Sequence, residues 1–234
     1  MYVYGRVGHR DGDWVTVKLS DMSDGDKFRI DKYGHGDVQV RIEDARKITT
    51  AQLKKTWAMI REVCMWQNDD AKSTKLMAET EQELKGEFYK ERNEPEFSLS
   101  DCSLETANKF IDFLIMFCYR EDIPWRSKTW DMIQGSYGAV YYGLKYRQCC
   151  ICRNHAEIAH VHAVGSGRNR RTIDHRGNYV MPLCYMHHEE EQHLIGITTF
   201  MNKYHIKGIK VDDHIAKMLK LGNYRIIEED NGDD

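Results

Sequence analysis

Apolar and polar residues alternate along the first 45 residues of the chain, which is the spacing of a half-buried β-strand. The alternation is interrupted at residues 10–13, RDGD, a sequence typical of a tight β-hairpin turn. It then continues through Phe28, Ile30, Val38, Val40 and Ile42. The pattern therefore predicts a small antiparallel sheet within residues 1–45.

Beyond residue 48 the apolar residues recur at intervals of three and four, which is the spacing of an amphipathic helix. A first helix is expected to begin at Thr49 or Thr50 and to end near Trp66. A second should cover about residues 70–92, and a third should start after Ser103. The apolar faces of these helices are predicted to form a core.

Residues 126–146 have a helical pattern but contain three glycines, each of which costs about 1 kcal/mol relative to alanine inside a helix. Such glycines are typical of a helix against which a neighbouring backbone packs closely. The same stretch interleaves aromatic residues with cations, and aromatic rings can stack single-stranded bases at ~1–3 kcal/mol per base. An interface between domains, or between two copies of the chain, explains these residues equally well. The aromatic residues are Trp130, Tyr137, Tyr141, Tyr142 and Tyr146.

Two pairs of metal-ligand residues flank a loop in the second half of the chain. Cys149 and Cys152 form a C-x-x-C pair, and Cys184 and His187 form a C-x-x-H pair further along. Three thiolates and one imidazole are a common donor set for a tetrahedral structural Zn²⁺. The spacing therefore predicts a closed zinc site without a catalytic role, and Cys150, between two ligands, is expected to be a spectator.

Further polar residues lie within this cysteine frame or just after it. His160, His162 and Asn178 lie between the two pairs, and His188 and His193 follow them. A neutral histidine can take a proton from water near neutral pH, and histidines are common ligands of divalent metal ions. The residues therefore favour hydrolytic chemistry that depends on a bound metal.

The order His160, Asn178, His188 inside a cysteine frame resembles the HNH nucleases, whose fold consists of two strands and a helix around one divalent metal ion. The resemblance implies that His160 is the general base, that Asn178 braces its loop, and that His188 is a metal ligand on the helix. It also implies Mg²⁺ or Mn²⁺ as the catalytic ion. The sequence HVHAVGSGRNR is most similar to the HNH units of phage recombination genes.

One position departs from the family pattern. The residue before the general base is commonly an aspartate or a histidine that helps to bind the metal, whereas this chain has Ala159. His162 could supply the missing ligand, and either Gln192 or His193 could supply the last ligand on the helix. Whether the site is active is left open by this departure.

Charge is distributed unevenly along the chain. The formal net charge is −3, which does not indicate a simple basic nucleic-acid binder. Between residues 145 and 176, however, basic residues outnumber acidic ones, and they flank the predicted metal site. Residues 223–234 form an acidic tail. The residues expected to contact DNA phosphates are Lys145, Arg147, Arg168, Arg170 and Arg171.

The chain is not expected to enter or cross a membrane. The first ten residues lack the apolar core of a signal peptide, and the longest apolar run, residues 113–119, is too short to span a bilayer. The cysteines outside the zinc frame occur singly in helical patterns, which suits a reducing compartment. We therefore expect a protein of the cytoplasm of a bacterial host.

A second resemblance covers about residues 30–130. The stretches ITTAQLKKTWAMIREVCMW and SLETANKFIDFLIMFCYREDIPW look like the lambda Orf (NinB) family of phage recombination mediators. The shared features include a K-x-W segment, here Lys55 and Trp57, and Trp125 after the third helix. The resemblance implies a toroidal homodimer that binds DNA, prefers single strands and cooperates with single-strand-binding protein.

These observations predict an α+β protein with two domains. A small N-terminal antiparallel sheet and helices form an Orf-like DNA-binding and dimerisation domain over residues 1–145, and a zinc-framed ββα-metal (HNH) domain covers residues 146–222. The expected function is a phage recombination protein that binds single-stranded or branched DNA and cuts it with the HNH domain. The alternative is a mediator without nuclease activity, whose zinc-stapled HNH unit only binds DNA.

Overall fold

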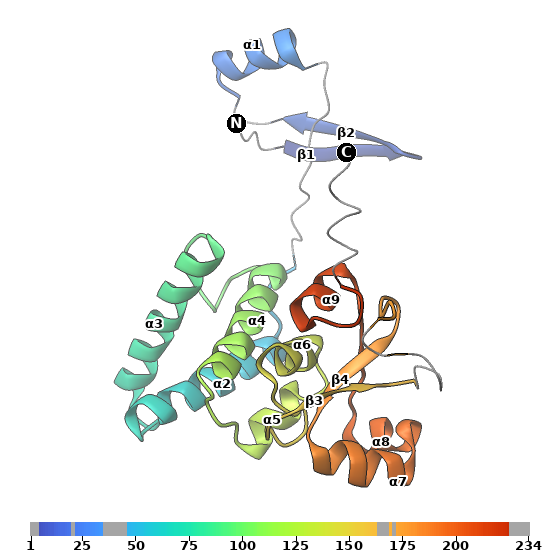
Figure 1. Ribbon diagram of the computed structural model, residues 1–234. Coiled ribbons are helices and arrows are strands. Elements are labelled where there is room, and N and C mark those ends of the chain that lie inside the picture. Colours follow the sequence, from blue (N-terminus) through green and yellow to red (C-terminus); the bar gives the residue numbers. More distant parts are fainter. Residues whose placement is uncertain (1–4, 20–21, 35–45, 163–168, 170–171, 225–234) are drawn as a thin grey trace. The chain divides into compact units, whose positions relative to one another are not determined.

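The computed structural model describes residues 5–19, 22–34, 46–162, 169 and 172–224 (Figure 1). Contacts divide the chain into two compact units, Met1–Glu43 and Asp44–Asp234. The described elements are helices and small antiparallel sheets, which confirms the predicted α+β class. None of the described helices combines the length and the apolar character that a membrane crossing requires.

The first unit begins with the predicted β-hairpin. β1 (Gly5–Asp11) pairs antiparallel with β2 (Trp14–Leu19), and Asp11 lies opposite Trp14 across a two-residue turn. Gly12 in this turn has a φ of 56°, a left-handed conformation that glycine adopts without a steric penalty.

The strand predicted around Phe28 and Ile30 is wrong, because α1 (Asp24–Tyr33) forms there. The Ser23 side chain caps this helix by accepting a hydrogen bond from the backbone N–H of Asp26. Two aspartates in the first turn also complement the helix dipole. These local capping interactions outweigh the alternating apolar pattern. The strand residues predicted further on, Val38, Val40 and Ile42, lie outside the described residues.

The second unit opens with the three predicted helices. α2 (Thr50–Asn68) starts with a capping box in which Thr49 and Gln52 satisfy each other's backbone N–H groups. α3 (Thr74–Arg92) begins a little later than predicted, because Asp69 adopts a left-handed conformation and Ser73 provides the cap. α4 (Leu104–Arg120) begins after Ser103, as predicted.

α4 is the centre of the first core. Every residue from Phe113 to Tyr119 is buried. The rings of Phe88, Phe110 and Phe113 pack against one another with centroids 5.3–6.1 Å apart. α2 and α3 cover this helix, so the predicted amphipathic faces form the core.

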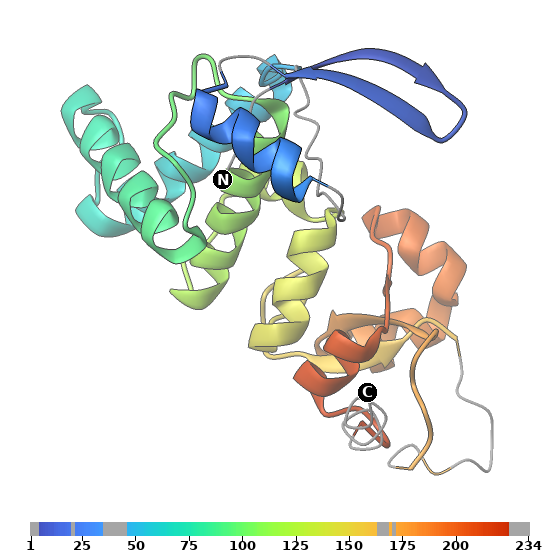
Figure 2. The same ribbon diagram turned by 90° about the horizontal axis from the view of Figure 1, so that it is seen from above.

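α6 (Tyr137–Tyr146) joins this core to a second one. It follows the short helix α5 (Ser127–Ile133) and contacts α4 as well as the sheet described next, as Figure 2 also shows. Its residues Ala139 and Tyr142 lie in the first core, whereas Val140 and Leu144 lie in the second. A Cβ atom added at Gly143 would lie 2.8 Å from the Gln148 carbonyl oxygen and from Pro182, so this glycine permits the close packing expected from the sequence.

The second core surrounds a small sheet and the elements that follow it. β3 (Glu157–His160), β4 (Tyr179–Leu183) and β5 (Ile209–Lys210) are antiparallel in the order β3-β4-β5. The π-helix η1 (Met186–Gln192) follows β4 and runs directly into α7 (His193–Ile195). α8 (Ile197–Tyr204) and α9 (Asp213–Leu219) complete the described fold. The succession β3, β4, η1 has the order of the predicted ββα unit.

The predicted domain boundary at residue 145 falls at the end of α6. Because α6 contributes to both cores, residues 46–162 and 172–224 belong to one compact unit in the structure. The assignment of residues 1–145 and 146–222 to separate functional domains therefore stays a prediction. Most of the predicted acidic tail lies outside the described residues.

Candidate metal centres and nuclease site

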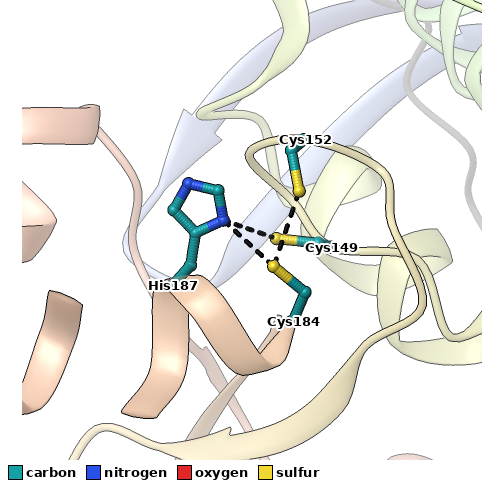
Figure 3. Close-up of side chains that lie close together, drawn as sticks. All are labelled: Cys149, Cys152, Cys184 and His187. Carbon is teal, nitrogen blue, oxygen red and sulfur yellow. Dashed lines mark hydrogen bonds between the residues drawn. The ribbon is translucent and has the colours of Figure 1, made fainter. Parts of the chain in front are cut away.

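The two predicted metal-ligand pairs come together in space (Figure 3). Cys149 and Cys152 lie in the turn after α6, Cys184 follows β4 directly, and His187 lies on η1. The four ligand atoms lie within 4.8 Å of one another. The Cys184 Sγ is 3.1 Å from the His187 Nδ1 and 3.5 Å from the Cys152 Sγ, and the Cys149 Sγ is 3.7 Å from that same Nδ1.

Local backbone geometry builds this Cys₃His cluster. Arg147 ends α6 in a left-handed conformation, and the Cys149 N–H then donates to the Asn154 carbonyl across a tight turn. Arg153 in this turn is also left-handed, with a φ of 64°. Backbone N–H groups of Ile151, Cys152 and Cys184 donate hydrogen bonds to the Cys149 sulfur. Donors around a sulfur stabilise it as a thiolate.

The Cys₃His cluster fits a metal ion such as zinc. A tetrahedral ion with Zn–S bonds of about 2.3 Å holds its ligand atoms about 3.4–3.8 Å apart, close to the spacing here. Burial raises the pKa of the Cys149 thiol and that of Cys152, the latter to about 12, so a cation is needed to make thiolates of them. Burial also lowers the pKa of His187, which favours the neutral imidazole that binds metals. Cys150 is buried but does not belong to the cluster.

The predicted general base lies on β3 and is paired with a second histidine. The Nε2 atom of His160 is 3.0 Å from the Nδ1 atom of His175, and His175 is only 2% exposed. A histidine in this basic stretch of the sequence would be expected at the surface near DNA, and the burial of His175 shows that expectation to be wrong. Gly222, in the segment after α9, explains the burial of His175. A Cβ atom added at Gly222 would lie only 2.5 Å from the His175 imidazole, so this segment packs directly against the ring.

Asn178 lies between this histidine and β4. Its backbone N–H donates to the His175 carbonyl over 3.1 Å, and its own carbonyl accepts from the N–H of Val211 over 2.8 Å. Gly177 donates to the Val211 carbonyl in the same way. The backbone at Asn178 thus ties the turn that carries His175 to the segment that leads into α9.

The π-helix decides which helical residues lie beside His188. In this winding each hydrogen bond spans five residues, and the His193 N–H donates to the His188 carbonyl. The two imidazole rings are consequently neighbours, with centroids 5.3 Å apart. Gln192, the other residue considered for this position, is buried, and its Oε1 atom has no hydrogen-bond partner within the described part of the chain.

Glu189 completes a second potential metal cluster with these two histidines, which we call the η1 cluster. One ligand atom from each of His188, Glu189 and His193 lies within 4.8 Å of the others. The Nδ1 atom of His188 is buried and makes no hydrogen bond to any described residue. His162 is exposed just after the end of β3, and it belongs to neither cluster found among the described residues.

The residues predicted to contact DNA are only partly described. Lys145 is exposed, and its ammonium group lies 5.4 Å from the centre of the Tyr146 ring. Arg147 is half-buried. Arg168, Arg170 and Arg171 lie outside the described residues. Of the aromatic residues considered for base stacking, Tyr137 is exposed, whereas Tyr142 is buried and donates a hydrogen bond to Asp112.

Comparison with known protein families adds one finding to this geometry. The family model described as "Putative HNHc nuclease" matches residues 25–222. The chain belongs to this family. Searches of curated proteins and of solved structures found no match. The match covers α1 from its second residue, the helices of the first core and both metal clusters, so one HNH family model includes the helical part as well as the ββα unit.

Two residues that lie beside predicted site residues were not identified from the sequence. His175 lies beside His160 although 15 positions separate the two residues in the sequence. Glu157 lies three residues before His160, yet its carboxylate is 3.8 Å from the Nδ1 atom of His188 on η1. A search for carboxylates on the same strand face as Ala159 would have found Glu157, since residues two apart in a strand share a face.

Proposed function

We propose that this HNH-family protein is a metal-dependent DNA endonuclease whose Cys₃His cluster holds a structural Zn²⁺. The observation that carries the proposal is that two adjacent histidines of η1, His187 and His188, belong to two different metal-ligand clusters. The His187 side chain belongs to the closed four-ligand cluster, whereas the His188 side chain belongs to the more exposed η1 cluster. A closed site is typical of structural zinc, and an open one leaves room for substrate and water.

The residues of β3 and its loop supply the acid–base chemistry in this proposal. His160 takes the proton from the attacking water, and His175 holds its imidazole in one orientation. Asn178 keeps the turn of His175 in place through its backbone hydrogen bonds. A divalent ion bound near His188 would neutralise the charge that develops on the phosphate and on the leaving oxygen.

We further propose that the substrate is single-stranded or branched DNA in phage recombination, and that the protein acts as a homodimer together with single-strand-binding protein. The support is the resemblance of the helical part to the Orf (NinB) mediators and the excess of basic residues in the sequence between residues 145 and 176. Lys145, Arg147, Arg168, Arg170 and Arg171 are assigned to the phosphates. The cysteines all lie in the described ranges and none forms a disulfide, which fits the reducing cytoplasm of a bacterial host.

The test is cleavage of defined DNA by the purified, zinc-loaded protein. Nicked, branched and single-stranded DNA are incubated with the protein in Mg²⁺ and, separately, in Mn²⁺. We expect cleavage that stops on addition of a chelator, and products with 5′-phosphate ends. His160→Ala should lower the rate by ~10²–10⁴-fold while zinc content and DNA binding stay unchanged, because only the base is lost. Full activity in His160→Ala would refute the assignment of the base.

Ala159 favours a second candidate function, a recombination mediator that binds DNA without cutting it. The position before the base carries a metal ligand in the family pattern, and here it is a fully buried methyl group. If the wild-type protein binds zinc and DNA but cuts none of the substrates in either metal ion, this second function replaces the first.

A further inference from the structure

We infer that Glu157 joins the η1 cluster to form a binding site for a first-row transition metal ion, in place of the ligand that Ala159 cannot supply. The site would hold the ion through two imidazoles and two carboxylates. A catalytic role for this metal site rests on the proposed nuclease function, but the ability of the site to bind a metal ion does not.

The strand geometry places Glu157 on the correct side of β3. Side chains two residues apart in a strand point to the same face, so Glu157 shares the face of Ala159. The Oε2 atom of Glu157 is 3.8 Å from the Nδ1 atom of His188. His162 has no comparable position, because β3 ends at His160.

The helix supplies the other three ligands through its π winding. The Oε1 atom of Glu189 is 3.4 Å from the Nδ1 atom of His188, and its Oε2 atom is 3.7 Å from the Nε2 atom of His193. In a tetrahedral site with bonds of about 2.1 Å, ligand atoms lie about 3.4 Å apart. These three groups are therefore close to the spacing of one bound ion, and Glu157, which approaches His188, must turn its side chain toward η1 to complete the set.

Ion pairs between the carboxylates and protonated imidazoles are the simpler explanation of this cluster. The environment of His188 argues against it. Its side chain is only 14% exposed, and its Nδ1 atom is enclosed without a hydrogen bond to any described residue, although two carboxylates lie within 4 Å. A buried nitrogen without a partner is costly unless a ligand uses its lone pair.

The donor set determines the class of ion. Neutral imidazoles suit first-row transition metals, whereas Mg²⁺ prefers oxygen ligands and water. Two carboxylates balance the charge of a divalent cation. The side chains of Glu157 and His193 are 65% and 57% exposed, so water or a phosphate oxygen can reach the ion. Mn²⁺ is the appropriate probe because it also accepts carboxylates.

The experiment is a Mn²⁺ titration of the full-length, zinc-loaded protein without DNA, in which the electron paramagnetic resonance signal reports free Mn²⁺. We expect about one bound Mn²⁺ per chain, retained in a large excess of Mg²⁺. Glu157→Gln and His193→Ala should each weaken binding about tenfold or more. Both side chains are exposed, so these variants should fold, and circular dichroism and zinc content verify this.

Two variants serve as matched controls. Glu190→Gln removes a neighbouring exposed carboxylate outside the cluster, and His162→Ala removes the alternative ligand. Both should bind Mn²⁺ like the wild-type protein. Absence of Mn²⁺ binding, or unchanged binding in Glu157→Gln, would overturn the inference. Mn²⁺ binding without DNA cleavage would refute the nuclease function alone, and DNA cleavage together with unchanged Mn²⁺ binding in Glu157→Gln would refute the metal site alone.

Discussion

The Nε2 atom of His160 lies 3.0 Å from the Nδ1 atom of His175, and the centroids of their rings are 5.0 Å apart. One of these nitrogens must carry the proton that the other accepts. If His160 donates from Nε2, its Nδ1 atom is left with a lone pair that can take a proton from water. In that arrangement His175 holds the proposed base in the tautomer and the orientation that proton transfer requires.

This pairing gives the first prediction. His175→Ala should lower the cleavage rate by about 10²-fold, because the base loses its orienting partner. His175→Asn should restore much of the rate, since the asparagine oxygen can accept a hydrogen bond close to the position of Nδ1. The measurement is kcat and KM on one DNA substrate, with thermal unfolding as the control for the buried site. Equal losses in the two variants would show that His175 has only a packing role.

The second prediction concerns the Cys₃His cluster. Cys184→Ser should lose the bound metal and unfold the core around β3 and β4, because a structural zinc contributes ~10–16 kcal/mol of apparent binding energy. The helices around α4 have their own core and should remain folded. Metal analysis and hydrogen exchange measure the two effects. Cys150→Ala is the matched control, a buried cysteine outside the cluster, and it should keep its metal. Metal-free wild-type protein, prepared without chelator, would contradict the assignment.

The third prediction concerns the packing of α6 against β4. Gly143→Ala should lower the free energy of unfolding by about 1–3 kcal/mol, because the added methyl group meets a backbone carbonyl. Gly86→Ala, in α3, should raise it by about 0.5–1 kcal/mol, since no atom lies within 4 Å of the new Cβ atom. Urea unfolding measures both. If Gly143→Ala also raised the free energy of unfolding, α6 and β4 would not be in close contact.

Arg153 provides the fourth prediction. Its guanidinium group donates hydrogen bonds to the carbonyls of Ile123 and Cys118 at the end of α4, and it lies 4.7 Å from the centre of the Tyr119 ring. Burial lowers its pKa, but an arginine stays charged. Arg153→Lys should destabilise the fold by about 1–3 kcal/mol, because a single ammonium group cannot serve these acceptors together.

The exposed Arg61 on α2 is the control for this substitution. Arg61→Lys should change the free energy of unfolding by less than about 0.5 kcal/mol. If Arg153→Lys is equally neutral, the link between the Cys₃His turn and α4 contributes little to stability.

Local signals explain what the sequence predicted correctly. Thr49 and Ser103 cap α2 and α4 through hydrogen bonds to residues three positions further on, so no distant part of the chain is needed to place these helix starts. The spacing of Cys149 and Cys152 similarly brings two thiols together by a tight turn. α1 shows the limit of a pattern, since a serine cap and an acidic first turn produced a helix where apolar alternation predicted a strand.

The sequence by itself determined the helices of the first core, the hairpin and the four residues of the Cys₃His cluster, because short-range hydrogen bonds and ligand spacing specify them. Only the tertiary structure decided the partners of the proposed catalytic residues. His175 lies beside His160 although 15 positions separate them in the sequence, and the π winding places His193 beside His188. These two contacts depend on packing between segments that are separate in the sequence and on how a helix winds under that packing. No local sequence pattern encodes either effect.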